Sequence, residues 1–364
     1  MKLQRHGGIA CLALSAALVL SACGSDNESL ADAAAGPDVD CATGTLNAQG
    51  SSAQKNAMAE WIKAYQQQCG GARINYEPSG SGAGIQALIA GTADFAGSDS
   101  ALKPQEQPQA DAKCTDGAAI HLPMVIGPVA VAYNVPGVDG LQLRPATLAK
   151  IFAGEITKWD DAEIKADNAD AELPSTTIQT IHRSDSSGTT DNFTAFLTAT
   201  AGDAWTFDKA KEWKAPGGTG AKGSDGVASR VSGAEGSIGY LEWSYAENAG
   251  LAIARIGNGA GEFAELTADS AGKAIAGAEV TGSGNDLKLK IDYNTDTPGA
   301  YPLVLVTYEI VCSDGLADDK LPLVKSFLSY AASADAQAGL TDLGYAPLPE
   351  EVRAKVATAV ESLS

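Results

Sequence analysis

The sequence predicts an α/β fold, because short β-like segments alternate along the chain with segments of helical periodicity. Residues 45–48 and 73–76 have strand character, and apolar residues recur at helical spacing through 57–65 between them. Near the end of the chain, residues 303–311 are strongly β-like, and residues 321–332 follow as an amphipathic helix. We therefore expect largely parallel or mixed sheets, and we find no internal repeat.

Two further segments complete this outline. Residues 122–134 are almost entirely apolar but are interrupted by Gly127-Pro128, which predicts a strand with a kink. Residues 178–183 predict another strand, which leads through a run of small polar residues into an apolar helical start at 193–197.

Composition limits the classes of function. The chain has 364 residues, of which 45% are hydrophobic and 19% charged, so it can form one large or two medium domains with buried cores. Its formal net charge of -20 argues against nucleic-acid binding, because phosphate backbones are bound by clustered Lys and Arg. An anionic ligand would have to be held by local donors against a repulsive overall field.

The N-terminal residues predict export. Lys2 and Arg5 precede an apolar core over residues 9–20, which is too short to span a membrane as a mature helix. The four residues LSAC that end at Cys23 resemble a bacterial lipobox. We therefore predict a lipoprotein signal peptide over residues 1–22 and acylation of Cys23, which would anchor the exported protein to the outer face of the cytoplasmic membrane. An ordinary secretion signal with an incidental cysteine is the alternative.

The remaining cysteines predict disulfides rather than a metal site. Once the signal peptide is removed and Cys23 carries the lipid, four cysteines are left in an oxidising compartment. None lies at C-x-x-C spacing and no histidine cluster accompanies them, so we expect neither a metal nor a cofactor. The pairing that we expect is Cys41 with Cys69 and Cys114 with Cys312.

Three segments rich in serine and glycine predict an anion site. Residues 50–53, 79–82 and 186–189 each follow a predicted strand and open a predicted helix. The first turn of a helix has unpaired N–H groups and a positive dipole end, and glycine lets a ligand approach the backbone. Any one of them could be a simple helix cap. Three such turns in an α/β chain favour a ligand site.

Two kinds of charged residue define the predicted ligand. Arg183 can offer an oxyanion a planar fork of donors, and Asp185 can hold that fork from two residues away. Asp99 would repel an anion unless the anion carries a proton to donate, as phosphate does at neutral pH and sulfate does not. A site that demands this hydrogen bond can discriminate by roughly 10⁴ to 10⁵. The alternative for Asp99 is an ordinary turn or cap residue.

These motifs resemble those of the phosphate-binding proteins of bacterial phosphate ABC transporters, members of the periplasmic binding protein class. The resemblance covers nearly all of residues 45–350. It rests on the order and spacing of Gly50-Ser-Ser, Tyr76 with Gly80-Ser-Gly, Asp94-Phe-Ala-Gly-Ser-Asp99, Lys158-Trp-Asp-Asp161, Arg183 with Asp185-Ser-Ser-Gly-Thr189, Lys222-Gly-Ser-Asp-Gly226 and Gly236-Ser-Ile-Gly-Tyr240.

The resemblance implies a phosphate site, with Asp99 accepting a phosphate proton and Asp185 orienting Arg183. Relatives from gram-negative bacteria have an aromatic residue and prolines where this chain has Ala53-Gln54-Lys55, so we expect a backbone donor rather than a packing role at Ala53. The implied ligand residues are Ser52, Ala53, Ser81, Asp99, Arg183, Ser187, Gly188 and Thr189.

The resemblance also implies a two-lobed periplasmic-binding-protein fold with two hinge crossovers and an interlobe cleft. Residues 23–40 are small and polar without periodicity, which predicts a flexible tether. One lobe is then expected over residues 41–126 plus 303–364, and the other over residues 127–302. The hinges are expected at Ile126-Gly127-Pro128 and at residues 300–303.

The function implied is that of an extracytoplasmic receptor, not an enzyme, which binds inorganic phosphate and delivers it to membrane-spanning ABC permease subunits. A binding protein for another oxyanion, such as sulfate or molybdate, is one alternative. The other is a serine hydrolase with Ser187 or Ser184 as nucleophile and His182 as base. On a strand His182 should face away from Arg183, and His121 is then the one histidine left in the mature chain, so a serine triad lacks an evident base.

Overall fold

A mixed β-sheet of nine strands runs through the residues that the computed structural model describes, 39–364. The strand order is β2-β1-β3-β14-β4-β8-β6-β7, and β9 also pairs with β4. The predicted signal peptide, the predicted lipidation site Cys23 and most of the predicted tether lie outside the described residues. The strands are β1 (Gly44–Gly50), β2 (Ala72–Glu77), β3 (Phe95–Ser98), β4 (Ala119–Asn134), β6 (Gln179–Arg183), β7 (Thr219–Ala221), β8 (Ser237–Glu242), β9 (Ala252–Ile253) and β14 (Val304–Cys312).

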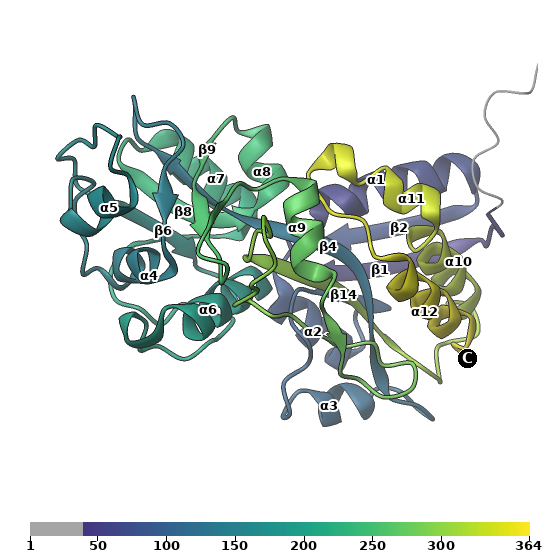
Figure 1. Ribbon diagram of the computed structural model, residues 1–364. Helices are drawn as coiled ribbons and strands as arrows, with labels where there is room; N and C mark the ends of the chain where they lie inside the picture. The colour runs from purple at the N-terminus through teal and green to yellow at the C-terminus, as the bar shows by residue number, and fades with distance from the viewer. Residues whose placement is uncertain (1–38) are drawn as a thin grey trace, which may run out of the picture. The chain divides into compact units, whose positions relative to one another are not determined.

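Strand β4 joins two halves of this sheet (Figure 1). Up to Pro128 it pairs with β14, and from Val129 onward it pairs with β8. The chain passes between the halves again near Leu303, whose carbonyl accepts a hydrogen bond from the Val129 amide at 2.9 Å. We call β2, β1, β3, β14 and the part of β4 up to Pro128 the first half, and the rest of β4 with β8, β6 and β7 the second half. The exchange of partners directly follows the predicted kink at Gly127-Pro128.

Strands β4 and β14 are nearly all apolar because they are buried on both faces. Every residue of β14 is buried, as is every residue of β4 except Asn134. Their register shifts between Thr307 and Tyr308, which leaves Met124 of β4 without a partner in a β-bulge. The Met124 carbonyl instead accepts a hydrogen bond from the side-chain amide of Gln337 at 3.0 Å.

Helices pack against both faces of the first half and around the second half (Figure 1). The longer ones are α1 (Lys55–Gln68), α2 (Ser81–Ala90), α4 (Pro145–Ala153), α6 (Gly188–Thr200), α7 (Gly223–Gly233), α9 (Ala268–Ile275), α10 (Leu321–Ala331) and α12 (Glu350–Glu361). The shorter ones are α3 (Gln107–Asp111), α5 (Ala162–Asp167), α8 (Trp243–Asn248), α11 (Ala334–Ala338) and the 3₁₀ turns Gly202–Ala204 and Thr341–Leu343.

The predicted periodicity accounts for how the helices pack. Helix α1 buries Ala57, Met58, Trp61 and Tyr65, the residues whose spacing predicts it, against the first half. In the second half, the ring of Phe193 stacks on that of Tyr240 with centroids 4.2 Å apart. Helix α9 follows the second half in sequence but contributes to a hydrophobic core with α2 and β14.

Two small sheets and two disulfides complete the described part. One sheet has the order β11-β10-β5 and the other pairs β12 with β13. Both expected disulfides are present, Cys41–Cys69 and Cys114–Cys312, each with a Cα–Cα distance of 5.3 Å. Among residues 39–364, no helix combines the length and apolar character needed to cross a bilayer. The small strands are β5 (Gln142–Leu143), β10 (Arg255–Gly257), β11 (Phe263–Ala264), β12 (Glu279–Val280) and β13 (Leu289–Lys290).

Candidate anion-binding site

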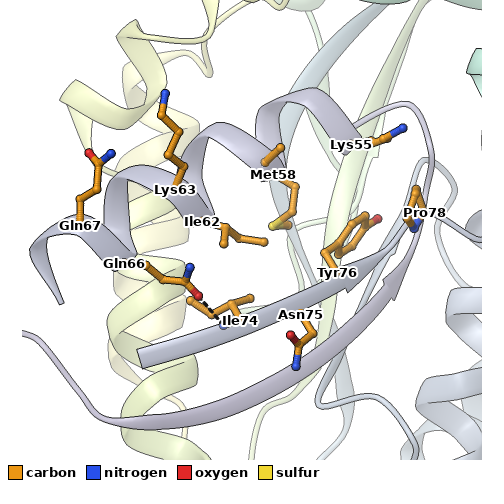
Figure 2. A pocket seen from close by; sticks show the side chains of 11 residues that line it. Lys55, Met58, Ile62, Lys63, Gln66, Gln67, Ile74, Asn75, Tyr76 and Pro78 are labelled. Carbon is orange, nitrogen blue, oxygen red and sulfur yellow. Dashed lines mark hydrogen bonds between the residues drawn. The ribbon is translucent and has the colours of Figure 1, made fainter. Parts of the chain in front are cut away.

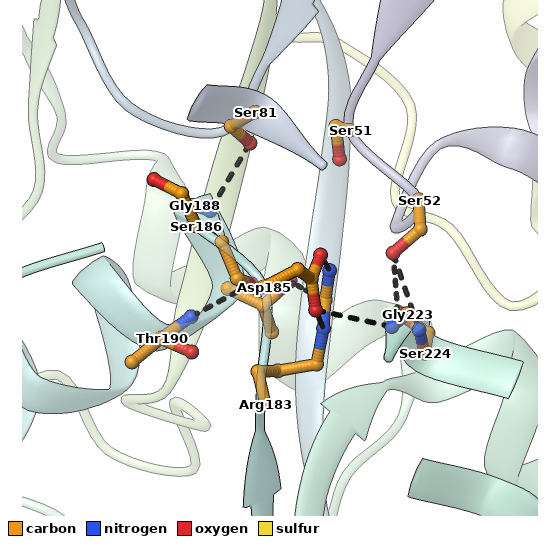
Figure 3. A network of polar contacts seen from close by, with 12 residues as sticks. Ser51, Ser52, Ser81, Arg183, Asp185, Ser186, Gly188, Thr190, Gly223 and Ser224 are labelled. Atoms are coloured by element: carbon orange, nitrogen blue, oxygen red, sulfur yellow. Dashed lines mark hydrogen bonds and ion pairs between the residues drawn. The ribbon is translucent and has the colours of Figure 1, made fainter. Parts of the chain in front are cut away.

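Segments that follow β1, β2 and β6 meet between the two halves of the sheet (Figure 3). The segment that follows β3 joins them through hydrogen bonds. Ser81 opens α2, Asp99 follows β3, and the stretch from Arg183 to Thr189 links β6 to α6. The amide of Gly188 donates to Ser81 Oγ at 3.1 Å, and Thr189 Oγ1 donates to Asp99 Oδ2 at 3.3 Å. Arg183 Nη1 in turn donates to Thr189 Oγ1 at 3.4 Å. The fold therefore joins these five residues, all predicted from the sequence, in one cluster.

Gly188 allows α6 to begin directly against the first half. A Cβ atom there would lie 2.5 Å from Ser81 Oγ and 2.6 Å from Asp99 Cβ, too close for any side chain. Ser187 caps the same helix, because its Oγ accepts the amide of Thr190 at 3.2 Å. The positive end of α6 thus lies at the cluster.

Arg183 is held in a fixed orientation although it is almost fully buried. Its Nε donates to Asp185 Oδ1 at 2.8 Å and its Nη2 to Asp185 Oδ2 at 2.5 Å. Burial by itself would raise the pKa of Asp185, but the hydrogen bonds and charge of Arg183 lower it below its usual value. Asp185 Oδ1 also accepts the Gly223 amide at 3.1 Å, which ties the pair to the start of α7. Nη1 is therefore the guanidinium nitrogen left to face the cluster.

Asp99 is a buried carboxylate surrounded by hydroxyl donors. Its Oδ1 accepts hydrogen bonds from Ser51 and, at 2.8 Å, from Thr307. Its Oδ2 has longer contacts, 3.4 Å from Ser81 and 3.3 Å from Thr189. Burial raises the pKa of Asp99 above its usual value, and the hydrogen bonds together with the positive charge of Arg183 oppose that rise.

Ser52 and Ala53 lie beside the cluster, but their polar groups have other partners. Ser52 Oγ accepts the amide of Ser224 at 3.2 Å, and the Ser52 carbonyl accepts the Tyr245 hydroxyl at 2.7 Å. The Ala53 amide donates to Ser51 Oγ at 3.0 Å. Ser52 thus bridges the first half to α7 and α8 rather than reaching Asp99, and Ala53 N–H is satisfied within its own turn.

Further contacts hold the two sides of the cluster together. The Gly82 amide donates to the Ser186 carbonyl at 3.0 Å, and Ser100 Oγ donates to Asp191 Oδ2 at 2.9 Å. Lys211 lies between α6 and β7 in the sequence and is buried, and it forms an ion pair of 3.1 Å with Glu106, which directly precedes α3. The first half and the second half are therefore closed on each other, and the polar groups of the cluster are shielded from water.

Neither histidine of the described residues forms a hydrogen bond with Ser184 or Ser187. The His182 ring stacks on Trp213 with centroids 5.0 Å apart, and its Nδ1 contacts the Arg183 carbonyl at 2.9 Å. His121 Nδ1 bonds to Asp286 at 2.7 Å, and its Nε2 accepts the Leu102 amide. Within residues 39–364 no group of three His, Cys, Asp or Glu residues is arranged to hold a metal.

Larger hollows on the described surface have a different character. A groove of 760 Å³ between α1 and β2 is floored by apolar side chains, among them Met58, Ile62 and Ile74 (Figure 2). The edge amide of Ile74 is already satisfied there by Gln66 Oε1 at 2.9 Å. None of the five residues of the cluster lines this groove. A smaller pocket of 370 Å³ is lined in part by Asp99 and Lys209 and lies directly beside the cluster.

Ser51 and Thr307 contact Asp99, and Ser224 contacts Ser52 beside the cluster, although the sequence motifs assign none of them a role. Ser51 lies in the predicted Gly-Ser-Ser turn, but spacing does not tell which of two adjacent serines faces Asp99. Thr307 is one of few polar residues in the apolar strand β14, which could have marked it. Ser224 lies in one of the segments that carry the resemblance and was given no role.

Comparison with known proteins gives one consistent group. A family model described as a PBP superfamily domain matches residues 35–335. The chain is 43% identical over 372 residues to phosphate-binding protein PstS 3 of Mycobacterium tuberculosis, with 100% of each chain covered. It is 34% identical over 319 residues to phosphate-binding protein PstS of Pasteurella multocida, covering 86% of this chain and 88% of that one.

Solved structures share the fold. A phosphate-binding protein from Stenotrophomonas maltophilia superposes with a TM-score of 0.67 at 19% identity, covering 86% of this chain and 93% of that one. An ABC-type phosphate transport receptor from Vibrio cholerae superposes with a TM-score of 0.54 at 18% identity, covering 84% and 100%. At these identities the likeness concerns the fold, and it agrees with the two-lobed α/β architecture expected from the sequence.

Proposed function

This chain belongs to the PBP superfamily and, within it, to the PstS phosphate-binding proteins, and from this premise we propose that it binds inorganic phosphate between the two halves of its sheet and delivers it to a membrane ABC permease. The observation that carries the proposal is the buried Asp99, surrounded by hydroxyls and the Arg183 guanidinium. A carboxylate at this position repels a fully ionised anion but can accept a hydrogen bond from an anion that carries a proton.

The cluster offers phosphate a complete set of partners. Ser81 Oγ, Thr189 Oγ1, the Gly188 amide and Arg183 Nη1 now bond to one another or to Asp99. When phosphate enters, these donors turn to its oxygens, and Asp99 Oδ2 accepts the proton that phosphate keeps. The full proposed ligand set is Ser52, Ala53, Ser81, Asp99, Arg183, Ser187, Gly188 and Thr189, with Asp185 holding Arg183.

Movement of two lobes about β4 would open this site and close it again. We assign residues 41–126 plus 303–364 to one lobe and residues 127–302 to the other, although α9 packs with the first. The exchange of β4 partners after Pro128 and the nearby passage at Leu303 support hinges at these two places. The cross-contacts of Ser52 with Ser224 and of Lys211 with Glu106 support the closed arrangement.

We also propose a role and a cellular location for the protein. The protein acts as a receptor and not as an enzyme, which is supported by the engagement of His182 with Trp213 and of His121 with Asp286. Acylation of Cys23 would hold it at the outer face of the cytoplasmic membrane, within reach of its permease. The two disulfides are consistent with an oxidising compartment outside the cytoplasm.

Titration calorimetry on the protein without its signal peptide tests the proposal. We expect phosphate to bind with a Kd of about 1 μM or tighter, about -8 kcal/mol or more favourable, and to be barely displaced by a large excess of sulfate. Arg183→Ala should weaken phosphate strongly, whereas Arg255→Ala, which removes an exposed partner of Glu265, should not. Equal affinities for phosphate and sulfate would remove the phosphate assignment.

A further inference from the structure

The two oxygens of Asp99 are not equivalent. Oδ1 is held by two short hydrogen bonds, from Ser51 and from Thr307 at 2.8 Å. Oδ2 has two longer contacts, with Ser81 at 3.4 Å and Thr189 at 3.3 Å, both of which are proposed phosphate ligands. Because those two hydroxyls would turn to a bound anion, Oδ2 becomes free to accept a proton from it, while Oδ1 stays engaged.

The Ser51 hydroxyl is fixed as a donor to Asp99. Its oxygen accepts the Ala53 amide at 3.0 Å, so its proton points to the carboxylate. Its backbone is held on both sides, since the Ser51 amide donates to the Gly97 carbonyl at 2.8 Å and the Ser51 carbonyl accepts the Tyr76 hydroxyl at 2.8 Å. The side chain therefore has little freedom to reach a ligand.

The Thr307 hydroxyl is directed at Asp99 from a position opposite the β-bulge of β4. The register between β14 and β4 shifts directly after Thr307, and bulges of this kind often redirect a side chain beside a site. Thr307 is fully buried, and its hydroxyl donates to Asp99 Oδ1. An apolar residue at this position would fit the surrounding strand, so the hydroxyl is explained by Asp99 rather than by packing.

Ionisation of Asp99 decides which anion the site accepts. An ionised Asp99 accepts a hydrogen bond from the O–H group of phosphate and repels sulfate, whereas a protonated Asp99 becomes a donor that sulfate can use. Burial favours the protonated form and raises the pKa of Asp99. The hydrogen bonds that oppose this rise most strongly come from Ser51 and Thr307. Hydrogen bonds to a charged group are each worth about tenfold or more in such an equilibrium.

We infer that Ser51 and Thr307 are positioning residues that set the selectivity of the site, by holding Asp99 ionised with Oδ2 turned toward the ligand. The inference rests on the proposed function and goes beyond the ligand set, because neither hydroxyl is needed to touch the anion. Loss of either hydroxyl should allow sulfate to bind more tightly.

The other ionisable groups around Asp99 are not themselves substituted in these variants. Arg183 provides positive charge from β6. Burial raises the pKa of Glu309 on β14 to about 8, and it raises the pKa of Glu242 on β8 well above its usual value. Burial likewise raises the pKa values of Tyr76 on β2 and Tyr245 on α8, so both stay neutral near pH 7. A change in pH profile between variants therefore reports on Asp99.

The test compares Thr307→Val with the unchanged protein by calorimetry with phosphate and sulfate from pH 5 to 8. Phosphate titrates in solution over this range, but equally for both proteins, so the ratio of sulfate Kd to phosphate Kd is compared at each pH. We expect Thr307→Val to lower this ratio by about tenfold, chiefly through tighter sulfate binding, and to shift its pH profile upward by about one unit. Ser51→Ala should act in the same direction.

Two matched variants separate positioning from packing. Thr307→Ser keeps the hydroxyl and should retain the original ratio. Thr147→Val removes a buried threonine hydroxyl that donates at 2.8 Å to Asp167, away from Asp99, and should leave the ratio unchanged. If folded Thr307→Val and Ser51→Ala both keep the original ratio and pH profile, the inference is wrong while phosphate binding stands. If the unchanged protein fails to prefer phosphate, the proposed function itself is wrong.

Discussion

A second acidic side chain lies close to Asp99 but lacks the hydrogen-bond donors that surround Asp99. Glu309 is two residues beyond Thr307 on β14 and is buried, and neither of its carboxyl oxygens has a hydrogen-bond partner among the described residues. Burial, reinforced by the charge of Asp99, raises the pKa of Glu309 from 4.5 to about 8. Burial thus favours the protonated form of Glu309 near pH 7, whereas the carboxylate of Asp99 is surrounded by hydroxyl donors.

Glu309→Gln should change how stability depends on pH. The folded protein binds the Glu309 proton more tightly than the unfolded chain, so this residue lowers the free energy of unfolding as pH rises from 4.5 to about 8. Glu309→Gln lacks this decrease in the free energy of unfolding. The difference in the free energy of unfolding between the variant and the unchanged protein should therefore grow over this window by at most about 1.4 kcal/mol per pH unit, reach a few kcal/mol and then level off. Urea unfolding at several pH values measures it.

The exposed substitution Glu350→Gln, at the start of α12, is the control for removing a carboxyl. Parallel stability curves for Glu309→Gln and the unchanged protein between pH 5 and 8 would show that Glu309 is ionised in the folded state.

Single residues of the site were predictable where a motif fixes both residue type and spacing. Arg183, Gly188 and Thr189 lie within one short turn, so their proximity follows from the local sequence. Thr307 reaches Asp99 across 208 residues of sequence, through strand pairing that periodicity does not specify. The choice between Ser51 and Ser52 likewise depends on the rotation of a turn, not on composition.

Among the elements, α6 is the helix whose N-cap residue is also a proposed ligand of phosphate. Ser187 is the N-cap of α6, accepting the Thr190 amide, and it is also a proposed phosphate ligand. Ser333 caps α11 in the same manner by accepting the Ala336 amide, but it is not part of the cluster around Asp99. The two serines form a matched pair for testing whether a cap has a second role.

Ser187→Ala and Ser333→Ala should each lower the free energy of unfolding by about 1 kcal/mol, the usual cost of a lost cap. Ser187→Ala should also weaken phosphate by about tenfold, because a hydroxyl that bonds to an anion is lost. Thermal unfolding and calorimetry on both variants measure the two effects. Equal phosphate affinities in the two variants would mean that Ser187 is a cap alone.

The long elements were predictable and the short ones were not. Strand β14 and helix α10 follow the patterns that predict them, since buried strands and amphipathic helices need sustained apolar sequences. The strands β5, β9 and β11 are each two residues long, too short to have any periodicity. Their pairing depends on tertiary contacts. The change of partner along β4 also lies outside what the apolar pattern predicts, although Gly127-Pro128 marks its place.

For the whole described molecule, the fold explains how a chain with a formal net charge of -20 can present a site for an anion. The long-range field is repulsive, so attraction must come from Arg183 and from oriented amides and hydroxyls at short range. In the function that we propose, closing the first half on the second half would remove water from these groups and strengthen each interaction with a bound anion. Closure would then be part of recognition, because the proposed ligand residues come from both halves.

A crystal structure of the protein with phosphate tests this account most directly. We expect the anion between the two halves, bonded to Ser81, Thr189 and Arg183, with one phosphate oxygen within hydrogen-bond distance of Asp99 Oδ2 and with Oδ1 still bonded to Ser51 and Thr307. Phosphate bound elsewhere, or an Asp99 Oδ2 that remains bonded to Ser81 and Thr189 alone, would contradict it.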